Sequence, residues 1–390
     1  MIPVGGTDRT LILESWRGAI LICVKNGDGK MRIAVLGGGH GSYAAAADLA
    51  ERGHDVRLWR RDAAALAPVL QSGSIRLKDA QGTRAVRLGL ATTQIGAALE
   101  GAELIVLPAP ATAQADIARA MAPHLESGQV VFCPPGTFGS YAMAAIVRAA
   151  GGAHDIAFAE TGTLPYLARK HAEDEIAITI RAKRLPLGVF PARQTQRALE
   201  TIARAYPAVH PIEDALSAAL MNAGPVIHPP LILMNAGPLE HFERWDIHNE
   251  GTQPAIRRVT DALDAERIAV REALGYAPYH YPLRDHYTSD RWMYGDAHDR
   301  LTESGDWRER IDLGTHRYMR EDVACGLAFL VSVAQWAGVA APVASGLLAI
   351  ASAALGEDLY ADSPRTLQAL GLAHLDRGAM QALLREGLGS

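Results

Sequence analysis

The chain has few of the features that mark disulfide-bonded or metal-binding proteins. Its 390 residues include only three cysteines, Cys23, Cys133 and Cys325, which are far apart and odd in number. They form neither a disulfide framework nor the closely spaced pairs of a zinc site, so a reducing compartment, the cytoplasm, is expected. The fourteen histidines contain no H-x-x-x-H pair, and we predict that the protein holds no metal.

The chain also lacks an excess of charge of one sign. Only 21% of the residues are charged and the formal net charge is −5. Binding to nucleic acid or to an anionic membrane surface calls for a strongly basic chain or patch, and neither is visible. We therefore expect no nucleic-acid partner, and a small anionic substrate would need basic residues placed locally.

Long hydrophobic runs are scarce as well. Residues 18–24 form one short apolar run without a small-residue cleavage site, which fits a signal peptide poorly. Residues 323–355 carry no charge, but Gly338 and Pro342 divide them into pieces shorter than the ~20 residues that a membrane span needs. We predict two buried helices in this region and no membrane partner.

What the sequence does contain is one informative stretch, Met31–Arg61. Residues 33–36 are a short apolar run suited to a buried parallel strand, and an Ala-rich run to Arg52 favours a helix. Between them lies Gly37-Gly-Gly-His-Gly-Ser42, and residues 55–59 form the next strand. Strand, glycine turn, helix and strand at this spacing predict a dinucleotide-binding βαβ unit.

In such a unit, the unpaired N–H groups and the positive dipole end of the helix hold a pyrophosphate. Ser42 stands at the third glycine position, a mild change, because that residue serves helix–strand packing. Cofactor contacts are expected from five residues of the turn: Gly37, Gly39, His40, Gly41 and Ser42.

The end of the second strand predicts which cofactor is bound. An acidic residue there would bind the ribose hydroxyls of NAD, but this chain has Arg60 followed by Arg61. Guanidinium groups pair with phosphates, so the two arginines favour the 2′-phosphate of NADP(H) over NAD(H). The alternative is that both arginines are solvated and Asp62 binds the ribose.

Strand and helix patterns alternate up to about residue 211, and strand patterns nearly vanish after residue 213. We predict an α/β Rossmann domain over 31–211 and an all-α domain over 212–390, with 1–30 as a disordered extension or a mis-assigned start before Met31. A hairpin is expected around residues 79–82. Helical spacing is found at 256–274, 322–337, 343–355 and 377–386.

Three loops follow predicted parallel strands, where open α/β sheets bind their ligands. Pro108 follows the strand 104–107, and Gly136 follows the strand 130–133. We expect both to contact the cofactor. Thr161, just after the strand that ends at Ala159, is a candidate for substrate binding.

His228 is a candidate for proton transfer. It precedes Pro229, which disfavours the α conformation, so we expect it on a non-helical break within the helical domain. Histidine can give and take a proton near neutral pH, as hydride transfer to a carbonyl or imine requires. The alternative is a turn histidine whose ring is hydrogen-bonded by the backbone.

A second candidate group lies in His316–Val323. Asp322 could orient His228 by accepting its ring N–H, and Arg317 could bind a substrate carboxylate. Alternatively, Asp322 caps the apolar helix that follows. Arg320 and Glu321 are expected to be solvated.

From Met31 to its end the chain resembles the octopine/nopaline (opine) dehydrogenase family. The similarity rests on five segments: Gly37-Gly-Gly-His-Gly-Ser42, Glu160-Thr-Gly-Thr-Leu-Pro-Tyr166, Asn222-Ala-Gly-Pro-Val-Ile-His-Pro-Pro230, Leu263-Asp-Ala-Glu-Arg267 and Arg317–Gly326. The resemblance implies that His228 is the catalytic acid/base, Asp322 its partner and Arg317 a substrate-binding residue. Asn222 is a further expected substrate contact. Ser42 and Ala324 depart from the family pattern.

The resemblance implies an NAD(P)H-dependent reductive condensation of an α-keto acid, such as pyruvate, with the amino group of an amino acid. Two alternatives remain. One is a dehydrogenase of a simple 2-hydroxy acid or polyol phosphate on the same two-domain plan. The other is a non-catalytic NADP-binding regulator. The Ala- and Gly-rich helices at 323–355 could also form a homodimer contact.

Overall fold

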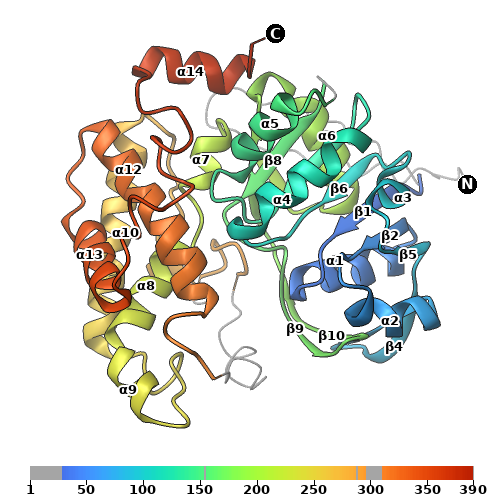
Figure 1. Cartoon of the computed structure of the whole chain (residues 1–390), viewed down its shortest axis with the longest axis horizontal. Helices are drawn as coiled ribbons and strands as arrows, with labels where there is room; N and C mark the ends of the chain where they lie inside the picture. The colour runs from blue at the N-terminus through green and yellow to red at the C-terminus, as the bar shows by residue number, and fades with distance from the viewer. Residues whose placement is uncertain (1–28, 153–154, 287–288, 296–309, 390) are drawn as a thin grey trace, which may run out of the picture.

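The computed structural model describes residues 29–152, 155–286, 289–295 and 310–389 (Figure 1). The predicted extension therefore falls almost wholly outside the described residues. An α/β half built on a large sheet lies beside a half made of helices (Figure 1). The predicted fold class is confirmed, since the last strand ends at Pro211 and every later described element is helical.

The large sheet has eight strands in the order β12-β11-β8-β7-β6-β1-β2-β5. β11 runs antiparallel to β8, and the pairs from β8 to β5 are parallel. The strands are β1 (Arg32–Leu36), β2 (Asp55–Trp59), β5 (Leu90–Thr92), β6 (Leu104–Val106), β7 (Val130–Cys133), β8 (Ala157–Thr161), β11 (Leu185–Phe190) and β12 (Val209–Pro211). The central strands are buried apolar runs, as expected of a sheet covered on both faces.

Helices connect these strands and cover the sheet (Figure 1). They are α1 (His40–Glu51), α2 (Ala63–Ser72), α3 (Ile95–Leu99), α4 (Ala111–Met121), α5 (Gly139–Ala149) and α6 (Thr195–Ala205), with short 3₁₀ turns η1 (Ala122–His124) and η2 (Ala192–Gln194). The three loops that sequence patterns marked as ligand-binding follow β6, β7 and β8, and they lie at the same edge of the sheet because these strands are parallel.

A second sheet, not expected from the sequence, has the order β4-β3-β10-β9. The predicted hairpin is confirmed as β3 (Ser74–Asp79) and β4 (Gly82–Arg87). It pairs with β9 (Tyr166–Ala172) and β10 (Glu175–Arg181), which come from much later in the chain. Sequence patterns showed each part, but the pairing of β3 with β10 joins segments that no local signal connects.

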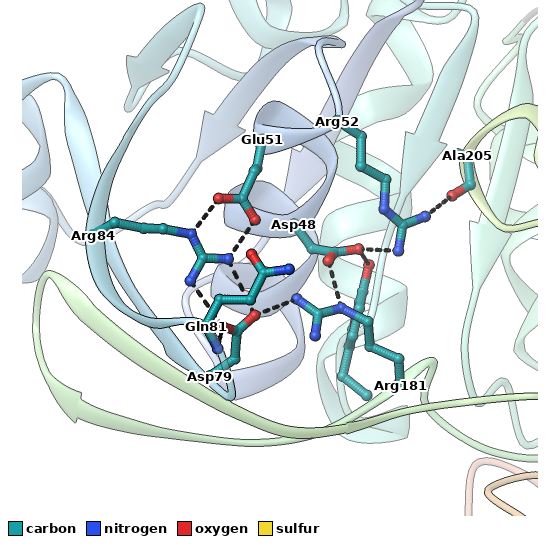
Figure 2. Close-up of polar contacts among 9 residues, drawn as sticks. Asp48, Glu51, Arg52, Asp79, Gln81, Arg84, Arg181 and Ala205 are labelled. Atoms are coloured by element: carbon teal, nitrogen blue, oxygen red, sulfur yellow. Dashed lines mark hydrogen bonds and ion pairs between the residues drawn. The ribbon is translucent and has the colours of Figure 1, made fainter.

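Helix α1 is buried over a continuous run, Gly41–Leu49. Its Ala-rich sequence has no polar face, because the second sheet covers the side that the large sheet does not. Figure 2 shows the ionic network that ties the end of α1 to this second sheet. Asp48 accepts from Arg181 Nε at 2.7 Å, and Arg181 Nη2 donates to Asp79 at 2.8 Å.

The network continues to the other edge of the second sheet. Arg84 Nη1 donates to Asp79 Oδ1 at 2.8 Å, and Arg84 Nη2 donates to Glu51 at 2.6 Å. Arg84 and Arg181 hold the pKa of Asp79 well below its usual range. Ion pairs that are shared in this way fix the sheet on α1 more firmly than isolated surface pairs would.

The second half contains α7 (Ala215–Ala219), α8 (Gly224–Met234), α9 (Ala236–His241), α10 (Pro254–Ala273), the 3₁₀ turn η3 (Leu283–Asp285), the π-helix η4 (Tyr318–Leu327), α12 (Ala328–Ala337), α13 (Pro342–Leu355) and α14 (Arg377–Glu386). The helices predicted over 256–274, 343–355 and 377–386 are confirmed within two residues at each end. The predicted helix 322–337 is two elements.

Residues 263–267, one of the segments shared with the resembled family, stabilise this half. Arg267 is buried and donates to the carbonyls of Leu220 and His280, while pairing with Asp264 at 2.7 Å. Glu266 accepts from the backbone N–H groups of Val343 and Ala344, the start of α13. A buried guanidinium with its donors satisfied and a carboxylate at a helix N-terminus are structural roles.

The two halves share one apolar core. Phe138 from the α/β half packs against Phe329 of α12, with ring centroids 5.5 Å apart. α14 returns to the α/β half, where Arg193 Nε donates to Glu386 O at 2.9 Å. By length and composition, the helical stretch Ala215–Met234 could cross a membrane, but 78% of its apolar window is buried, as in the core helix of a soluble protein.

Candidate active site

The glycine turn has the geometry that a dinucleotide needs. Gly37 has φ +122°, which only glycine adopts without strain, and its N–H donates to Trp59 O. Gly39 is the N-cap of α1, with no side chain capping the helix, and no atom lies within 4 Å of the position a Cβ would take. The first N–H groups of α1 therefore face open space, where a pyrophosphate fits.

The remaining residues of the turn divide between packing and ligand contact. Ser42 is buried and its hydroxyl donates to Leu36 O at 3.4 Å, which holds the turn together. Pro108 packs over Gly41, 3.0 Å from where a Cβ would stand. His40 Nδ1 accepts from Lys170 N at 2.9 Å, so its ring lies against β9.

Arg60 lies across the glycine turn, with Nε 2.4 Å from the position of a Cβ on Gly38. Its Nη1 donates to Ala65 O at 2.9 Å and pairs with Glu173 at 2.6 Å. Arg61 is exposed. Asp62 Oδ1 accepts from Ala65 N at 3.1 Å and thereby caps α2. Arg60 therefore lies at the glycine turn, whereas Asp62, the alternative ribose ligand, caps a helix.

Gly136 and Glu160 meet at the carboxyl ends of β7 and β8. Glu160 is fully buried and accepts from Phe138 N at 2.9 Å and Ser140 N at 2.8 Å, so it closes the start of α5. Burial raises the pKa of Glu160 to about 7, although these N–H groups lower it. Gly136 packs directly on this carboxylate, 2.3 Å from a hypothetical Cβ.

His228 and Asp322 form a close pair, with Nδ1 and Oδ2 2.7 Å apart. Both side chains are mostly buried, with 13% and 7% exposed. The expected non-helical break at His228 is wrong, because α8 continues through Pro229 and Pro230. Proline disfavours this conformation without forbidding it, and burial of apolar side chains such as Ile232 offsets the cost of about 3 kcal/mol.

Asp322 lies inside the π-helix η4, so the alternative, in which it caps the following helix, is wrong. A π-helix bonds residue i to residue i+5, and residues five apart then lie one turn above each other. Arg317, the residue before η4, comes near Asp322 in this way and lowers its pKa, while burial raises that pKa to about 6. A Cβ at Gly224 would stand 2.2 Å from Asp322 Oδ1, so glycine permits this close approach.

Tyr318 and His248 also lie at the site, although no sequence pattern marked them. The Tyr318 ring stacks on the His228 imidazole with centroids 3.7 Å apart and planes at 11°. The Tyr318 hydroxyl lies 2.9 Å from His248 Nε2. His228 is thus oriented by a carboxylate at its edge and an aromatic ring on its face. Only the fold brings these helices together.

The predicted substrate residues lie where the two halves meet. Asn222 Nδ2 donates to Thr137 Oγ1 at 2.8 Å, and its Oδ1 accepts from Gly224 N at 3.1 Å. Asn222 therefore links the loop after β7 to α8. Thr161 is fully buried at the end of β8, and its hydroxyl donates to Thr163 O at 2.8 Å. The hydroxyl of Thr161 thus stabilises its own loop.

Glu321 differs from the expectation that it is solvated, whereas Arg320 agrees with it, because the Arg320 side chain is 39% exposed. Glu321 Oε1 accepts from Ala111 N at 3.0 Å, at the start of α4. Burial raises the pKa of Glu321 to about 6. Arg320 Nη1 pairs with Glu357 at 2.6 Å. Three consecutive charged residues of the π-helix thus contact three different parts of the molecule: Arg320 pairs with Glu357 just after α13, Glu321 binds the start of α4, and Asp322 pairs with His228 on α8. Across the described residues, no group of three or more His, Cys, Asp or Glu side chains could hold a metal ion.

Comparisons with known proteins agree with both halves of this geometry. Residues 211–355 match the family described as NAD/NADP octopine/nopaline dehydrogenase, alpha-helical domain. Residues 32–139 match the NAD-dependent glycerol-3-phosphate dehydrogenase N-terminus. The first match covers α8 and η4, which hold the His228–Asp322 pair, and the second covers the glycine turn.

Two relatives match over nearly their whole length. An opine dehydrogenase from Arthrobacter sp. (strain 1C) is 28% identical over 356 residues, which are 90% of this chain and 97% of the relative. A vitopine synthase from Allorhizobium ampelinum is 27% identical, with 87% of this chain and 95% of the relative covered.

Solved structures show the same fold. An octopine dehydrogenase in complex with NADH and agmatine superposes with a TM-score of 0.71 at 18% identity, over 93% of this chain and 99% of the other. A yersinopine dehydrogenase with NADP⁺ bound gives 0.62 at 16% identity, over 92% and 98%. Over its helical half and over its whole length, the chain is thus similar to octopine/nopaline (opine) dehydrogenases.

Proposed function

We propose that the protein is an NAD(P)-dependent oxidoreductase acting on CH–NH donors. It condenses an α-keto acid, such as pyruvate, with the amino group of an amino acid and reduces the resulting imine; the reverse oxidation follows the same path. The observation that carries the proposal is the His228–Asp322 pair, 2.7 Å apart, beside the loops at the carboxyl ends of the parallel strands. An opine dehydrogenase and a vitopine synthase that match over nearly their whole length support it.

In this proposal His228 is the general acid and base. Its Nδ1–H donates to Asp322, so Nε2 carries the exchanged proton. A protonated His228 gives this proton to the hydroxyl of the carbinolamine, and water leaves as the iminium forms. Asp322 stabilises the imidazolium, and the stacked Tyr318 ring fixes its plane. The bound cofactor supplies the hydride that reduces the iminium carbon.

Arg317 is proposed to hold a substrate carboxylate. It is exposed at the start of η4, next to the His228–Asp322 pair, and a guanidinium binds a carboxylate through two parallel hydrogen bonds. Asn222 and Thr161 are proposed to line the substrate side at the junction of the halves. Holding both reactants in one orientation accounts for a large part of the rate enhancement in such a condensation.

NADP(H) is proposed as the favoured cofactor. Gly37, Gly39, His40, Gly41 and Ser42 would form the pyrophosphate turn, and Pro108 and Gly136 would line the cofactor from the next two strand ends. Arg60 beside Gly38 and the exposed Arg61 support recognition of a 2′-phosphate. Relatives of known structure hold NADH in one case and NADP⁺ in another, so the cofactor has to be tested on this chain.

The function is tested by oxidation of NADPH with pyruvate, with and without a panel of amino acids. Turnover that requires both pyruvate and one class of amino acid is expected. Turnover with pyruvate alone would instead identify a 2-hydroxy acid dehydrogenase. NADPH binding, followed by fluorescence, without turnover under any of these conditions would identify a regulator.

We also propose a cytoplasmic enzyme that pairs as a homodimer through its C-terminal domain. The two cysteines among the described residues, Cys133 and Cys325, are buried free thiols, as a reducing compartment allows. On α13 the side chain of Ile350 is 59% exposed among alanines and glycine. Sedimentation equilibrium of the wild type and of Ile350→Glu tests the dimer, which the charge is expected to dissociate.

A further inference from the structure

The second sheet places a carboxylate at the cofactor turn. Glu173, in the turn between β9 and β10, accepts from Arg60 Nη1 at 2.6 Å. Lys170 Nζ donates to the same Glu173 oxygen at 2.8 Å. Glu173 is distant from Arg60 in sequence, so a motif at the end of β2 gives no sign of it. The acidic residue that follows β2 in NAD-dependent enzymes is replaced here by Arg60. Glu173, from the second sheet, nevertheless supplies a carboxylate beside Arg60.

The turn that carries Glu173 is held in place on α1. Lys170 N donates to His40 Nδ1 at 2.9 Å, and Lys170 Nζ lies 4.0 Å over the Tyr43 ring. At the other end of β10, Arg181 binds Asp48 in the network of Figure 2. The hairpin is therefore fixed at both ends of the same helix whose first turn faces the proposed pyrophosphate.

We propose that Glu173 is a specificity-determining residue, which occupies Arg60 with a carboxylate so that the 2′-phosphate of NADPH must compete for the guanidinium. The inference rests on the proposed cofactor function. It adds that Glu173, a residue of the second sheet, weakens the preference for NADPH, so that the protein binds NADH as well. Arg61 is exposed and takes no part in this ion pair, so we assign it as the cation that favours the 2′-phosphate.

The electrostatics support this assignment. Lys170 and Arg60 lower the pKa of Glu173, so its carboxylate is ionised at neutral pH. A 2′-phosphate brought to Arg60 would add negative charge beside this carboxylate, and like charges at such distances repel. NADH has hydroxyls at that position, which can donate hydrogen bonds to a carboxylate. Removing the charge of Glu173 should therefore strengthen the binding of NADPH and leave the binding of NADH nearly unchanged.

The experiment is equilibrium binding of NADPH and of NADH, followed by fluorescence without substrate, in wild type and Glu173→Gln. Because the pair is half exposed, we expect NADPH to bind about fivefold more tightly to the variant and NADH to change less than about twofold. The gain for NADPH should shrink at high salt. Asp174→Asn is the matched control. It removes the same charge from the same turn, but Asp174 pairs with Arg76 and not with Arg60.

A double-mutant cycle with Arg60→Gln isolates the contact, because the effect of Glu173→Gln on NADPH should largely disappear without Arg60. Unchanged or weaker NADPH binding in Glu173→Gln, or an equal change for both cofactors, would overturn the inference and leave the proposed function standing. If the wild type binds neither cofactor, the proposed function fails first and the inference with it.

Discussion

The glycine turn and the His228–Asp322 pair are built in opposite ways. The turn consists of six consecutive residues, and it acts largely through backbone N–H groups and the space left by missing side chains. The pair joins side chains 94 residues apart, on α8 and on a π-helix. A ligand site made of backbone can be encoded locally, whereas a proton-transfer pair depends on how two helices pack.

This contrast also shows where each site is vulnerable. In the turn, replacing one glycine by alanine adds a methyl group to the surface that the cofactor is proposed to contact. In the pair, we expect replacement of either side chain to keep the fold and to remove the proposed proton transfer. Substitutions in the two regions should therefore separate cofactor binding from turnover.

The largest effect is expected from His228→Ala. Loss of the general acid and base should lower kcat by about 10²–10⁴-fold, while NADPH binding stays near that of the wild type. Steady-state kinetics and fluorescence titration measure the two. His374→Ala, at an exposed histidine, is the control. Turnover like that of the wild type would remove His228 from the mechanism.

Asp322→Asn should have the next largest effect. The amide can present its N–H to Nδ1 and thereby favour the wrong imidazole tautomer, so kcat should fall about 10–100-fold with little change in KM for NADPH. The pH profile of kcat should shift as well, because the buried carboxylate no longer stabilises the imidazolium. Asp322→Glu should recover part of the activity. A variant with an unaltered kcat and pH profile would show that Asp322 does not act through His228.

Two alanine substitutions in the turn test the local site. Gly37→Ala forces φ +122° on a residue with a Cβ, 2.7 Å from Ser42 Oγ, and should lower the free energy of unfolding by about 1–3 kcal/mol. Gly39→Ala meets no atom within 4 Å and should lower stability less, by about 0.5–1 kcal/mol, because alanine is a poorer N-cap than glycine. It should nevertheless weaken NADPH binding, since its methyl group enters the space facing the helix N-terminus. Urea unfolding and titration separate the two effects, and equal stability losses would contradict this account.

The smallest effect concerns Glu160, whose pKa is about 7 in the folded protein against 4.5 for an ordinary glutamate. The folded state holds this proton over the interval and the unfolded state releases it. Stability from this group is therefore lost as pH rises from 4.5 to about 7. Urea unfolding across this range should show a slope up to about 1 kcal/mol per pH unit steeper in the wild type than in Glu160→Gln. The same substitution at exposed Glu100 should leave the slope unchanged.

Local sequence patterns predict most of the strands, helices and turns of this protein. Apolar runs bounded by glycine marked β1 and β2, helical spacing marked α10 and α14, and turn residues marked the β3–β4 hairpin. The same local chemistry indicated the cofactor turn, because its function lies in consecutive residues. His228, Arg317 and Asp322 were selected as candidates by residue type and family resemblance, without a geometry.

The contacts between these candidate residues follow from long-range packing. Pro229 argued against a helix at His228, but burial of α8 against η4 outweighs that preference. The π-helical spacing that brings Arg317 near Asp322, the Tyr318 ring on His228 and the carboxylate of Glu173 at Arg60 all depend on long-range packing. Local preferences of about 1–3 kcal/mol are overridden when a packed core gains more, so contacts between distant residues cannot be read from the chain alone.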